Sequence, residues 1–361
     1  MRFIVINTKK TYLPKKEKYS AYIEKIYDSG WITNRGSLVV ELQDRLEKYL
    51  GVSNVLLVSN GTLALQVAYK LLGLTKEVVT TPFSFVATTS SLVWEKLTPI
   101  FSDIDKYTFN IDPYIIEENV TENTTGIVAT HVFGNPCEFE QLNNVADKYN
   151  LKLIYDGAQA FNVKISGESI LSQGDLTTLS FHATKIFHTI EGGALIIKND
   201  ELYQTAKKMI NFGFEREDTI TELGINAKMN EFEAAMGLCV LDDVSNIIEK
   251  QKSISDIYHT ELEGYVQFQK VNPNVDNNYN YFPIILKNES QLLQVLQVFR
   301  ENNIRLRRYF YPSLDKLPYI KNKSKIDNSR EISDRILCLP IYCDLPENDL
   351  ETIIRLLKEN V

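Results

Sequence analysis

The chain lacks several features that define whole classes of protein. Its four cysteines form no CxxC pair and have no accompanying cluster of histidines, so neither a disulfide framework nor a zinc site is expected. No run of about 18 apolar residues is present, which excludes a membrane-spanning helix. The apolar run Phe3–Ile6 is too short for the core of a signal peptide. We therefore expect a soluble, cytoplasmic protein with reduced thiols at Cys137, Cys239, Cys338 and Cys343 and with no bound metal.

Glycine, proline and basic residues are also scarce. The 16 Gly and 11 Pro among 361 residues exclude collagen-like and low-complexity classes. Lys and Arg number 39 against 47 Asp and Glu, a net charge of −8, which argues against nucleic acid as a partner. A small anionic ligand is still compatible with this charge, because a few backbone N–H groups bind phosphate whatever the net charge. The length suggests about two domains.

Short apolar runs recur between residues 55 and 197, and several of the gaps between them have helical periodicity. Alternation of strands and helices is typical of a mainly parallel sheet covered by helices. The helical gaps include Leu63–Leu72, which stops at Gly73, and Glu138–Tyr149. The predicted strands are Val55–Val58, Val78–Thr80, Pro99–Phe101, Ile127–Thr130, Leu151–Tyr155, Leu176–Phe181 and Ala194–Ile197.

Outside this region the pattern predicts other elements. A helix is expected over Leu38–Leu50, with Ser37 as its N-cap and Gly51 as its C-cap. Residues 1–264 would form the large domain and residues 265–361 a smaller α+β domain. The further predicted elements are helices at Glu201–Asn211, Asn230–Glu263, Ser290–Asn302 and Glu347–Glu359, and strands at Tyr279–Leu286 and Arg305–Phe310.

Ligands of open α/β sheets bind beyond the carboxyl ends of the strands, so the residues that follow each strand are candidates for a site. Ser59-Asn60-Gly61-Thr62 joins a strand to a helix N-terminus, where free N–H groups attract an anion. The same segment also fits an ordinary capped turn. Thr81-Pro82-Phe83-Ser84-Phe85 follows the next strand and offers an aromatic ring, either for stacking or for the core.

Two charged residues end later strands. Asp156 follows Leu153-Ile154-Tyr155, and a carboxylate there needs a cation or several donors; a helix N-cap is the alternative. Lys185 ends Ser180-Phe181-His182-Ala183-Thr184-Lys185, and a desolvated lysine can form a Schiff base, although most loop lysines are simply solvated. Pyridoxal phosphate enzymes pair an acidic residue with the ring nitrogen of the cofactor. The four features together, in this order, favour that cofactor.

The same segments resemble the DegT/DnrJ/EryC1/StrS family of sugar aminotransferases, which have the fold-type I architecture. The resemblance extends over nearly the whole chain and is most specific at Asp156-Gly157-Ala158-Gln159-Ala160 and at Ser180–Lys185 with Glu191-Gly192-Gly193. It implies a large domain with a mainly parallel, mixed seven-stranded sheet, a smaller α+β C-terminal domain, and pyridoxal 5'-phosphate as cofactor. Further matching segments are Gly30–Asn34, Leu57–Leu65, Phe101–Asp105, Phe109–Asp112 and Leu339–Ile341.

The resemblance also implies roles for individual residues. Lys185 would form the Schiff base and move the proton, and Asp156 would hold the pyridine nitrogen. Phe85 would lie against the ring and Gln159 would face its hydroxyl. The phosphate would be bound by Gly61, Thr62 and Ser180, and Asn60 would also contact the cofactor.

One further segment, Gly224–Asn230, looks like the family's segment that reaches the neighbouring subunit's site. Asn226 would then bind the partner's phosphate in an obligatory homodimer. Ile225 and Lys228 depart from the aromatic residue and the arginine that many family members carry. The first 14 residues match weakly, so no role is transferred to them.

The stretch from Lys185 to Gly193 most resembles family members that aminate C4 of a dTDP-4-keto-6-deoxyhexose. The implied reaction moves an amino group from L-glutamate to dTDP-4-keto-6-deoxyglucose and gives dTDP-4-amino-4,6-dideoxyglucose for surface polysaccharide. The alternatives are amination at C3 of a dTDP-3-keto-6-deoxyhexose and a non-catalytic regulatory protein on the same fold. Lys185 speaks against the family's 3-dehydratases, which carry histidine there, and no GxGxxG follows a strand to favour a nicotinamide enzyme.

Overall fold

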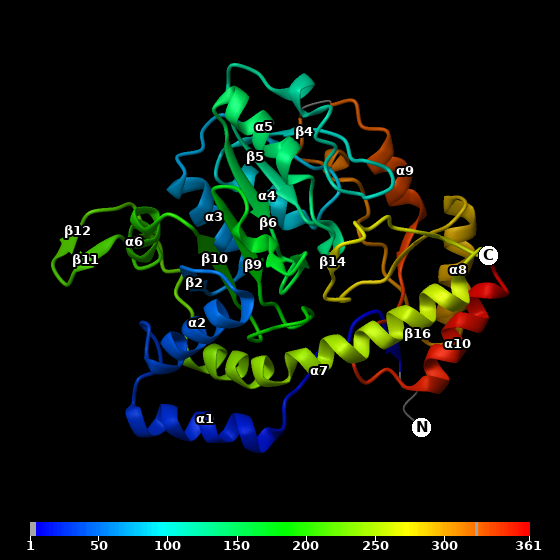
Figure 1. Cartoon of the computed structure of the whole chain (residues 1–361), viewed down its shortest axis with the longest axis horizontal. Helices are drawn as coiled ribbons and strands as arrows, with labels where there is room; N and C mark the ends of the chain where they lie inside the picture. The colour runs from blue at the N-terminus through cyan, green and yellow to red at the C-terminus, as the bar shows by residue number, and fades with distance from the viewer. Residues whose placement is uncertain (1–4, 322–323) are drawn as a thin grey trace.

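The computed structural model describes residues 5–321 and 324–361, so Phe3 and Ile4 of the apolar run at the start lie outside the described residues. A seven-stranded sheet forms the centre of the molecule (Figure 1), in the order β2-β10-β9-β6-β5-β3-β4. β10 runs antiparallel to both of its neighbours, and the other pairs are parallel. The strands are β2 (Val55–Val58), β3 (Glu77–Thr80), β4 (Thr98–Phe101), β5 (Thr124–Thr130), β6 (Lys152–Asp156), β9 (Leu176–Ser180) and β10 (Gly193–Ile197).

All seven predicted strands are present, and the mainly parallel, mixed sheet is confirmed. Successive side chains of a strand point to opposite faces, so the continuous apolar runs supply both faces at once. Leu56 and Val58 pack under α3, whereas Val55 and Leu57 pack toward α2 and α7. The helices on the first face are α3 (Gly61–Leu71), α4 (Val86–Trp94) and α6 (Asp200–Met209), and those on the second are α2 (Ser37–Leu50), α5 (Phe139–Tyr149) and α7 (Glu231–Leu262).

The start of α2 differs from the prediction. Ser37 is the first helical residue and Gly36 is the N-cap, with no side-chain cap of its own. The carboxylate of Glu231, at the start of α7, accepts hydrogen bonds from the N–H groups of Leu38 and Val39 at 2.8 and 3.1 Å. A distant acid therefore satisfies the donors that a local N-cap would otherwise satisfy, which the local sequence did not indicate.

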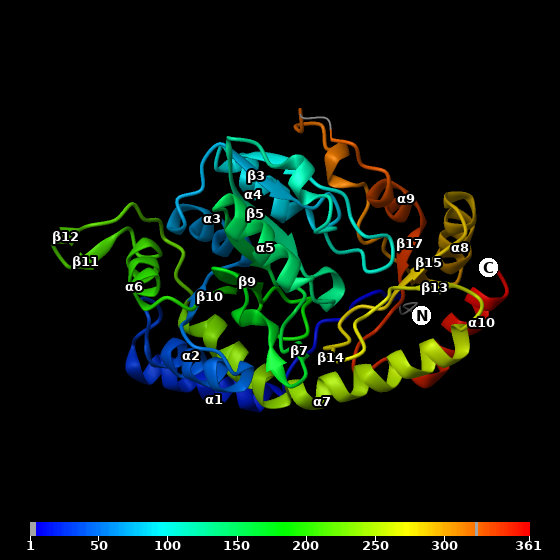
Figure 2. The same ribbon diagram turned by 45° about the horizontal axis from the view of Figure 1, so that its top comes forward.

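Helix α7 connects the two parts of the molecule. Its 32 residues begin at a capping box in which Asn230 and Glu233 satisfy each other's backbone N–H groups. Its first part lies between α2 and α1 (Lys16–Ser29) (Figure 1), and the helix runs beneath the sheet to α10 (Glu347–Lys358) (Figure 2). It therefore sets the spacing between the sheet and the C-terminal elements.

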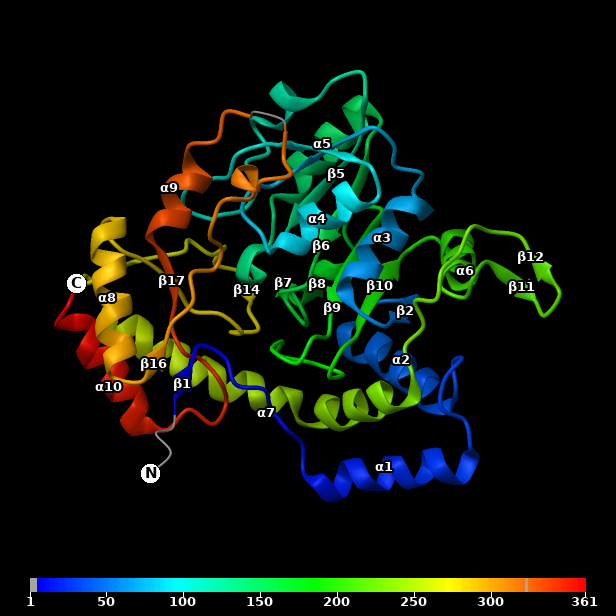
Figure 3. The ribbon, with the colours of Figure 1, turned by 180° about the vertical axis from the view of Figure 1, so that it is seen from behind.

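The C-terminal part is a small α+β unit. Three short antiparallel strands, β13 (Gln267–Phe268), β15 (Pro283–Ile285) and β17 (Ile336–Cys338), pack among helices that share one apolar cluster. The chain's first strand joins this part, because β1 (Ile6–Asn7) pairs in parallel with β16 (Ile304–Arg305), as Figure 3 shows from behind. The helices of this cluster are α8 (Glu289–Glu301), α10 (Glu347–Lys358) and the end of α7, whereas α9 (Asn328–Arg335) packs into a neighbouring cluster through Ile332.

Two predicted strands of this part are shorter than expected. Of Tyr279–Leu286 only Pro283–Ile285 is a strand, because Asn278 bonds the carbonyls of Gln159 and Phe161 and holds the preceding chain against the large domain. Of Arg305–Phe310 only Arg305 is in a strand, since β1 offers just two pairing residues. Tyr281 of the first segment and Leu306, Arg307, Tyr309 and Phe310 of the second border the cavity described below.

The boundary between residues 264 and 265 stays a prediction, and two strand pairings cross it. β1 joins the C-terminal part, and β14 (Val275–Asp276) pairs with β7 (Lys164–Ile165), which in turn pairs with β8 (Glu168–Ser169). A hairpin of β11 (Phe214–Arg216) and β12 (Thr219–Ile220) projects beyond α6, away from the sheet (Figure 1).

Candidate active site

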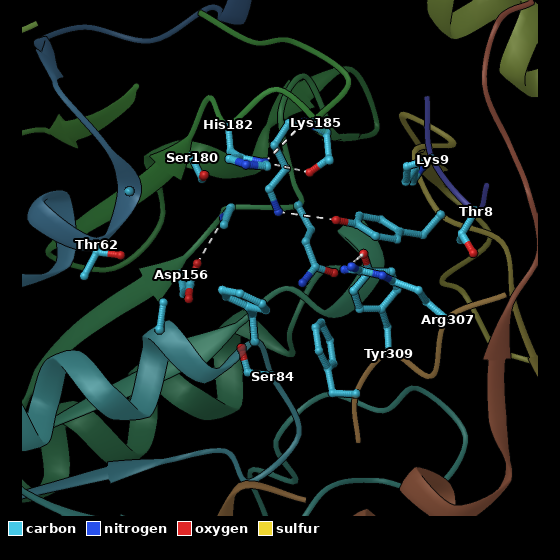
Figure 4. Close-up of a pocket in the computed structure, with 18 of the residues that line it drawn as sticks. Thr8, Lys9, Thr62, Ser84, Asp156, Ser180, His182, Lys185, Arg307 and Tyr309 are labelled. Carbon is cyan, nitrogen blue, oxygen red and sulfur yellow. Dashed lines mark hydrogen bonds between the residues drawn. The ribbon is translucent and has the colours of Figure 1, made fainter. Parts of the chain in front are cut away.

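A cavity of about 890 Å³ lies where the carboxyl ends of β6 and β9 face the C-terminal part. Its floor comes from the sheet and from the N-terminal ends of α3 and α4, and its opposite wall comes from β1, β16 and the segment that follows β16. Figure 4 shows the side chains that converge there. The position agrees with the rule that open α/β sheets bind ligands beyond the carboxyl ends of their strands.

Lys185 reaches into the cavity from the loop after β9. Its Nζ donates a hydrogen bond to the hydroxyl of Tyr281 at 3.3 Å. Burial lowers the pKa of Lys185, while the negative charge of Asp156 opposes the shift. A larger share of this lysine is therefore the neutral amine near pH 7 than is usual, and the neutral amine is the form that acts as nucleophile or base.

Asp156 ends β6 on the other side of the cavity and is only 5% exposed. One carboxylate oxygen accepts a hydrogen bond from the Thr88 hydroxyl at 2.7 Å, and the other accepts from the N–H of Ala158 at 3.1 Å. Ser84 and Thr130 extend this chain of hydroxyls behind Thr88. Asp156 caps a turn through its bond to Ala158, and no helix follows it. The alternative interpretation of Asp156 as a helix N-cap is therefore wrong.

The N-terminus of α3 forms a cradle of close backbone contacts. A Cβ on Gly61 would lie 2.8 Å from the Cβ of Ser180, and a Cβ on Gly193 would lie 2.7 Å from the backbone N of Gly61. Only glycine permits this approach. The Asn60 carboxamide accepts from the N–H of Leu63 at 2.8 Å and so acts as the N-cap.

The cradle gathers four predicted residues. Asn60, Gly61, Thr62 and Ser180 all border the cavity. Ser180 lies against Gly61, and Thr62 is the next residue of the helix. Hydroxyls at a helix N-terminus, together with its N–H groups, form a donor set that suits a phosphate group.

Gln159 and Phe85 border the space between the cradle and Lys185. The side-chain oxygen of Gln159 accepts from the N–H of Phe133 at 2.6 Å, which leaves the NH₂ end as a donor for a ligand. Phe85 is 54% exposed although it lines the cavity. An exposed aromatic face in a cavity is suited to stacking on a planar ring.

His182 and Glu191 lie at the edge of the cavity. The Nδ1 of His182 is 2.8 Å from the Thr184 hydroxyl, and its Nε2 is 3.7 Å from the Glu191 carboxylate. Asn226 does not line the cavity of its own chain. It is exposed, and its side-chain oxygen accepts from Lys228 Nζ at 2.9 Å. The structure thus brings together every predicted site residue except Asn226.

Several residues of the site were missed by sequence reasoning. Thr88 holds Asp156, and its position one helical turn after Ser84 was the available signal. The opposite wall is formed by Lys9, Tyr281, Arg307 and Tyr309. No role was transferred to the segment that contains Lys9, and the other three residues lie in the two predicted strands of the C-terminal part. Nothing in their local sequence links them to the sheet, because only the packing of the C-terminal part places them there.

Residues 5–321 and 324–361 contain neither a metal-binding cluster nor a helix that could span a membrane. No group of three or more His, Cys, Asp or Glu side chains is arranged to hold a metal ion. No helix there has the length and hydrophobicity needed to cross a bilayer. All four cysteines are free thiols, and Cys137, Cys239 and Cys338 are buried.

Comparison with known proteins agrees with this geometry. The dTDP-4-amino-4,6-dideoxy-D-glucose transaminases of Shigella dysenteriae and Escherichia coli are 39% and 37% identical to this chain, each over 96% of both chains. The crystal structure of DesI in the presence of its TDP-sugar product is 30% identical and superimposes with a TM-score of 0.93, over 98% of this chain and 92% of DesI. The DegT/DnrJ/EryC1/StrS aminotransferase family model matches residues 14–358. The chain therefore belongs to the DegT/DnrJ/EryC1/StrS aminotransferase family.

Proposed function

We propose that this aminotransferase uses pyridoxal 5'-phosphate to move the amino group of L-glutamate to C4 of dTDP-4-keto-6-deoxyglucose, giving dTDP-4-amino-4,6-dideoxyglucose. The observation that carries the proposal is the convergence of Lys185, Asp156 and the glycine-lined end of α3 on one cavity. The names of the Shigella and Escherichia relatives support the sugar and the position of amination, and the TDP-sugar product of DesI supports the nucleotide.

The cavity fits the proposed cofactor group by group. The cradle at Gly61 and Gly193, which a Cβ would fill, is open enough for a phosphate to approach the backbone N–H groups. Asp156 is a buried carboxylate suited to a protonated ring nitrogen. Phe85 offers a stacking face, and Gln159 offers a donor to the ring hydroxyl.

When bound, pyridoxal phosphate supplies an electron sink that stabilises negative charge at the donor's α-carbon. Lys185 would hold the cofactor at rest and, once the amino donor has displaced it, its neutral Nζ would take the proton from that carbon and pass it to the cofactor. The lowered pKa of Lys185 suits this work, since a base must be unprotonated to accept a proton. Tyr281 keeps the amine directed into the cavity through the 3.3 Å hydrogen bond.

Asp156 acts by position rather than by proton transfer. Two hydrogen bonds, from Thr88 and Ala158, fix both carboxylate oxygens, so the negative charge stays aimed at the cavity. A fixed carboxylate keeps the ring nitrogen protonated, and a protonated ring withdraws electrons more strongly. In the second half-reaction Lys185 would take a proton from the cofactor, deliver it to C4 of the sugar, and then displace the amino group of the product.

We further propose that the enzyme is a homodimer in which Asn226 reaches the phosphate in the partner's cavity. The surroundings of Asn226 support this proposal. Four apolar side chains near the projecting hairpin are exposed, and exposed apolar patches are typical of protein interfaces. These are Phe212 (48%), Ile220 (64%), Leu223 (77%) and Ile225 (42%).

The proposal extends to the biological role of the enzyme and to its location in the cell. Synthesis of a nucleotide-linked amino sugar suits a supply role for surface polysaccharide. A cytoplasmic location suits an enzyme with four free cysteine thiols, because the cytoplasm keeps thiols reduced.

The test is to purify the protein with pyridoxal phosphate and follow both half-reactions. The wild-type holoenzyme should absorb visible light, lose that absorbance with L-glutamate, and regain it with dTDP-4-keto-6-deoxyglucose. Lys185→Ala should abolish turnover, and continued transamination by that variant would refute the mechanism. A panel that includes a dTDP-3-keto-6-deoxyhexose separates C4 from C3 amination, because a preference for the 3-keto sugar would overturn the proposed position. A protein that binds no pyridoxal phosphate would instead favour the non-catalytic alternative.

A further inference from the structure

Lys9 is held in the cavity wall by a segment distant in sequence from the rest of the site. The preceding residue, Thr8, donates both its N–H and its hydroxyl to the carbonyl of Arg305, at 3.1 and 2.9 Å. The pairing of β1 with β16 continues this contact. The backbone therefore fixes where the Lys9 side chain starts, and Lys9 lines the cavity beside the site (Figure 4).

The amine of Lys9 has neutral neighbours. Its Nζ donates to the side-chain oxygen of Asn280 at 3.0 Å and lies 4.5 Å from the centre of the Tyr281 ring. Lys185 uses the same tyrosine, since its Nζ bonds the Tyr281 hydroxyl and lies 5.8 Å from the ring centre. Two lysine amines thus share one aromatic ring, and no acidic side chain forms an ion pair with Lys9 within the described part of the chain.

This arrangement leaves the positive form of Lys9 poorly stabilised. Burial lowers the pKa of Lys9 to about 7; the thiol of Cys338 opposes the shift and the charge of Lys185 adds to it. An ammonium group without an anionic partner is costly in a buried position. A bound anion would remove that cost, so the position has the character of an anion site.

The cavity as a whole has an excess of basic residues, although the chain carries a net charge of −8. Both acidic side chains of the cavity already have partners. Asp156 accepts hydrogen bonds from Thr88 and Ala158, and the Glu191 carboxylate lies 3.7 Å from His182. The basic residues divide into two groups. Arg300, Arg305 and Arg307 are exposed, whereas Lys9 and Lys185 lie deeper, on either side of Tyr281.

Resting on the proposed function, we propose that Lys9 binds the α-carboxylate of the amino donor. That carboxylate is attached to the carbon that carries the reacting amine, so it must lie close to Lys185, where Lys9 is the neighbouring cation. The diphosphate of a nucleotide sugar is separated from the reacting carbon by the sugar ring. It therefore fits the outer arginines, Arg300 and Arg305, better than it fits Lys9.

The proposed role explains why a lysine and not an arginine stands at position 9. The same space must hold a charged carboxylate in one half-reaction and a neutral sugar ring in the other. A lysine can give up its proton when no anion is present, whereas an arginine cannot. Lys9 therefore accommodates both substrates in one position, which a fixed charge would not.

The test compares donors that differ only at the α-carboxylate. L-Glutamate and its α-amide, isoglutamine, are each given to the holoenzyme. The second-order rate constant of the first half-reaction is measured for each donor. In the wild type we expect a strong preference for glutamate. Lys9→Met should reduce the rate constant for glutamate on the order of 10- to 100-fold, because it removes one charged hydrogen bond. The rate constant for isoglutamine should change little, because that donor has no α-carboxylate. Lys9→Arg, which keeps the charge, should retain the preference for glutamate.

Lys10→Met is the matched control. Lys10 is the adjacent residue and is exposed, where it pairs with Asp344, so its replacement should leave both donors unaffected. A readout without turnover is the binding of glutarate, which has both carboxylates of glutamate but no amine. Titration of the holoenzyme should show weaker glutarate binding in Lys9→Met alone. An unchanged thermal unfolding midpoint in that variant would exclude misfolding as the cause.

The remaining outcomes separate the two proposals. If Lys9→Met keeps the preference for glutamate over isoglutamine, the assignment of Lys9 is wrong while the proposed function stands. If the variant slows only the half-reaction with the nucleotide sugar, Lys9 serves the diphosphate and the assignment is again wrong. If the wild-type holoenzyme does not react with glutamate, the proposed function fails, and the assignment of Lys9 fails with it.

Discussion

The hydroxyl of Thr88 donates a 2.7 Å hydrogen bond to the carboxylate of Asp156, joining helix α4 to the end of strand β6. Thr88 is itself in contact with Ser84, which accepts from Thr130, so the carboxylate is anchored to a buried chain of hydroxyls. Residues that orient a charged ligand of a cofactor affect function almost as strongly as the ligand itself. Thr88 is thus a positioning residue for the site.

Thr88→Val keeps the shape of the side chain and removes its donor. We expect about tenfold weaker binding of pyridoxal phosphate, because a hydrogen bond to a charged group is lost. Equilibrium titration of the apoenzyme measures this. Thr89→Val is the control, because the buried Thr89 hydroxyl has no hydrogen-bond partner within residues 5–321 and 324–361. Equal effects of the two substitutions would contradict the role given to Thr88.

Gly193→Ala should weaken the phosphate cradle selectively. The new Cβ would lie 2.7 Å from the backbone of Asn60 and Gly61, so the N-terminus of α3 must move. We expect affinity for pyridoxal phosphate to fall by about tenfold or more, since the lost contacts are several N–H bonds to an anion. Binding of pyridoxal, which lacks the phosphate, provides the comparison. If both compounds lose affinity equally, the cradle does not bind the phosphate.

Mixing two inactive variants tests the proposed homodimer. A Lys185→Ala chain paired with an Asn226→Ala chain forms one site with both residues intact and one site with neither. Because the sites of a two-fold dimer are equivalent, the heterodimer should regain about half of the wild-type activity. Each variant alone should be impaired, and activity assays after co-expression with different affinity tags measure the recovery. No recovery in a purified heterodimer would show that Asn226 does not serve the partner's site.

Acid should destabilise the fold through His131. The ring is buried against Tyr155, and burial lowers the pKa of His131 to about 3 from an ordinary 6.5. Between these values the unfolded chain binds a proton that the folded chain does not, so stability falls as the pH falls from 6.5 toward 3. The slope from this group is up to about 1.4 kcal/mol per pH unit.

The variant His131→Asn keeps an acceptor for the N–H of Cys137 and cannot titrate. Thermal unfolding midpoints measured at several pH values between 4 and 7 should therefore fall less steeply for His131→Asn than for the wild type. A lower midpoint at every pH is expected from the lost packing and does not affect the test. Parallel curves for the two proteins would show that His131 does not account for the acid sensitivity.

The local elements were predicted well because their signals are local. The seven apolar runs became the seven strands, and the helix predicted at Asn230–Glu263 is α7, with Asn230 as its N-cap. The order of cradle, aromatic residue, carboxylate and lysine along the chain was also readable, since parallel strands present their carboxyl ends at one edge of the sheet. The N-cap of α2 was mispredicted, because its partner, Glu231, is almost 200 residues away.

By itself, the sequence determined the class of fold, the family, and the residues that line the cavity from the side of the sheet. These depend on hydrophobic periodicity and on side chains that follow strands, and both are properties of short segments. Only the tertiary structure decided which residues face them. The pairing of β1 with β16 places Lys9 against the ring of Tyr281, and the hydroxyl of Tyr281 accepts a hydrogen bond from Lys185. Such contacts join residues far apart in the chain, and their energy comes from burial shared between both parts, so no local pattern records them.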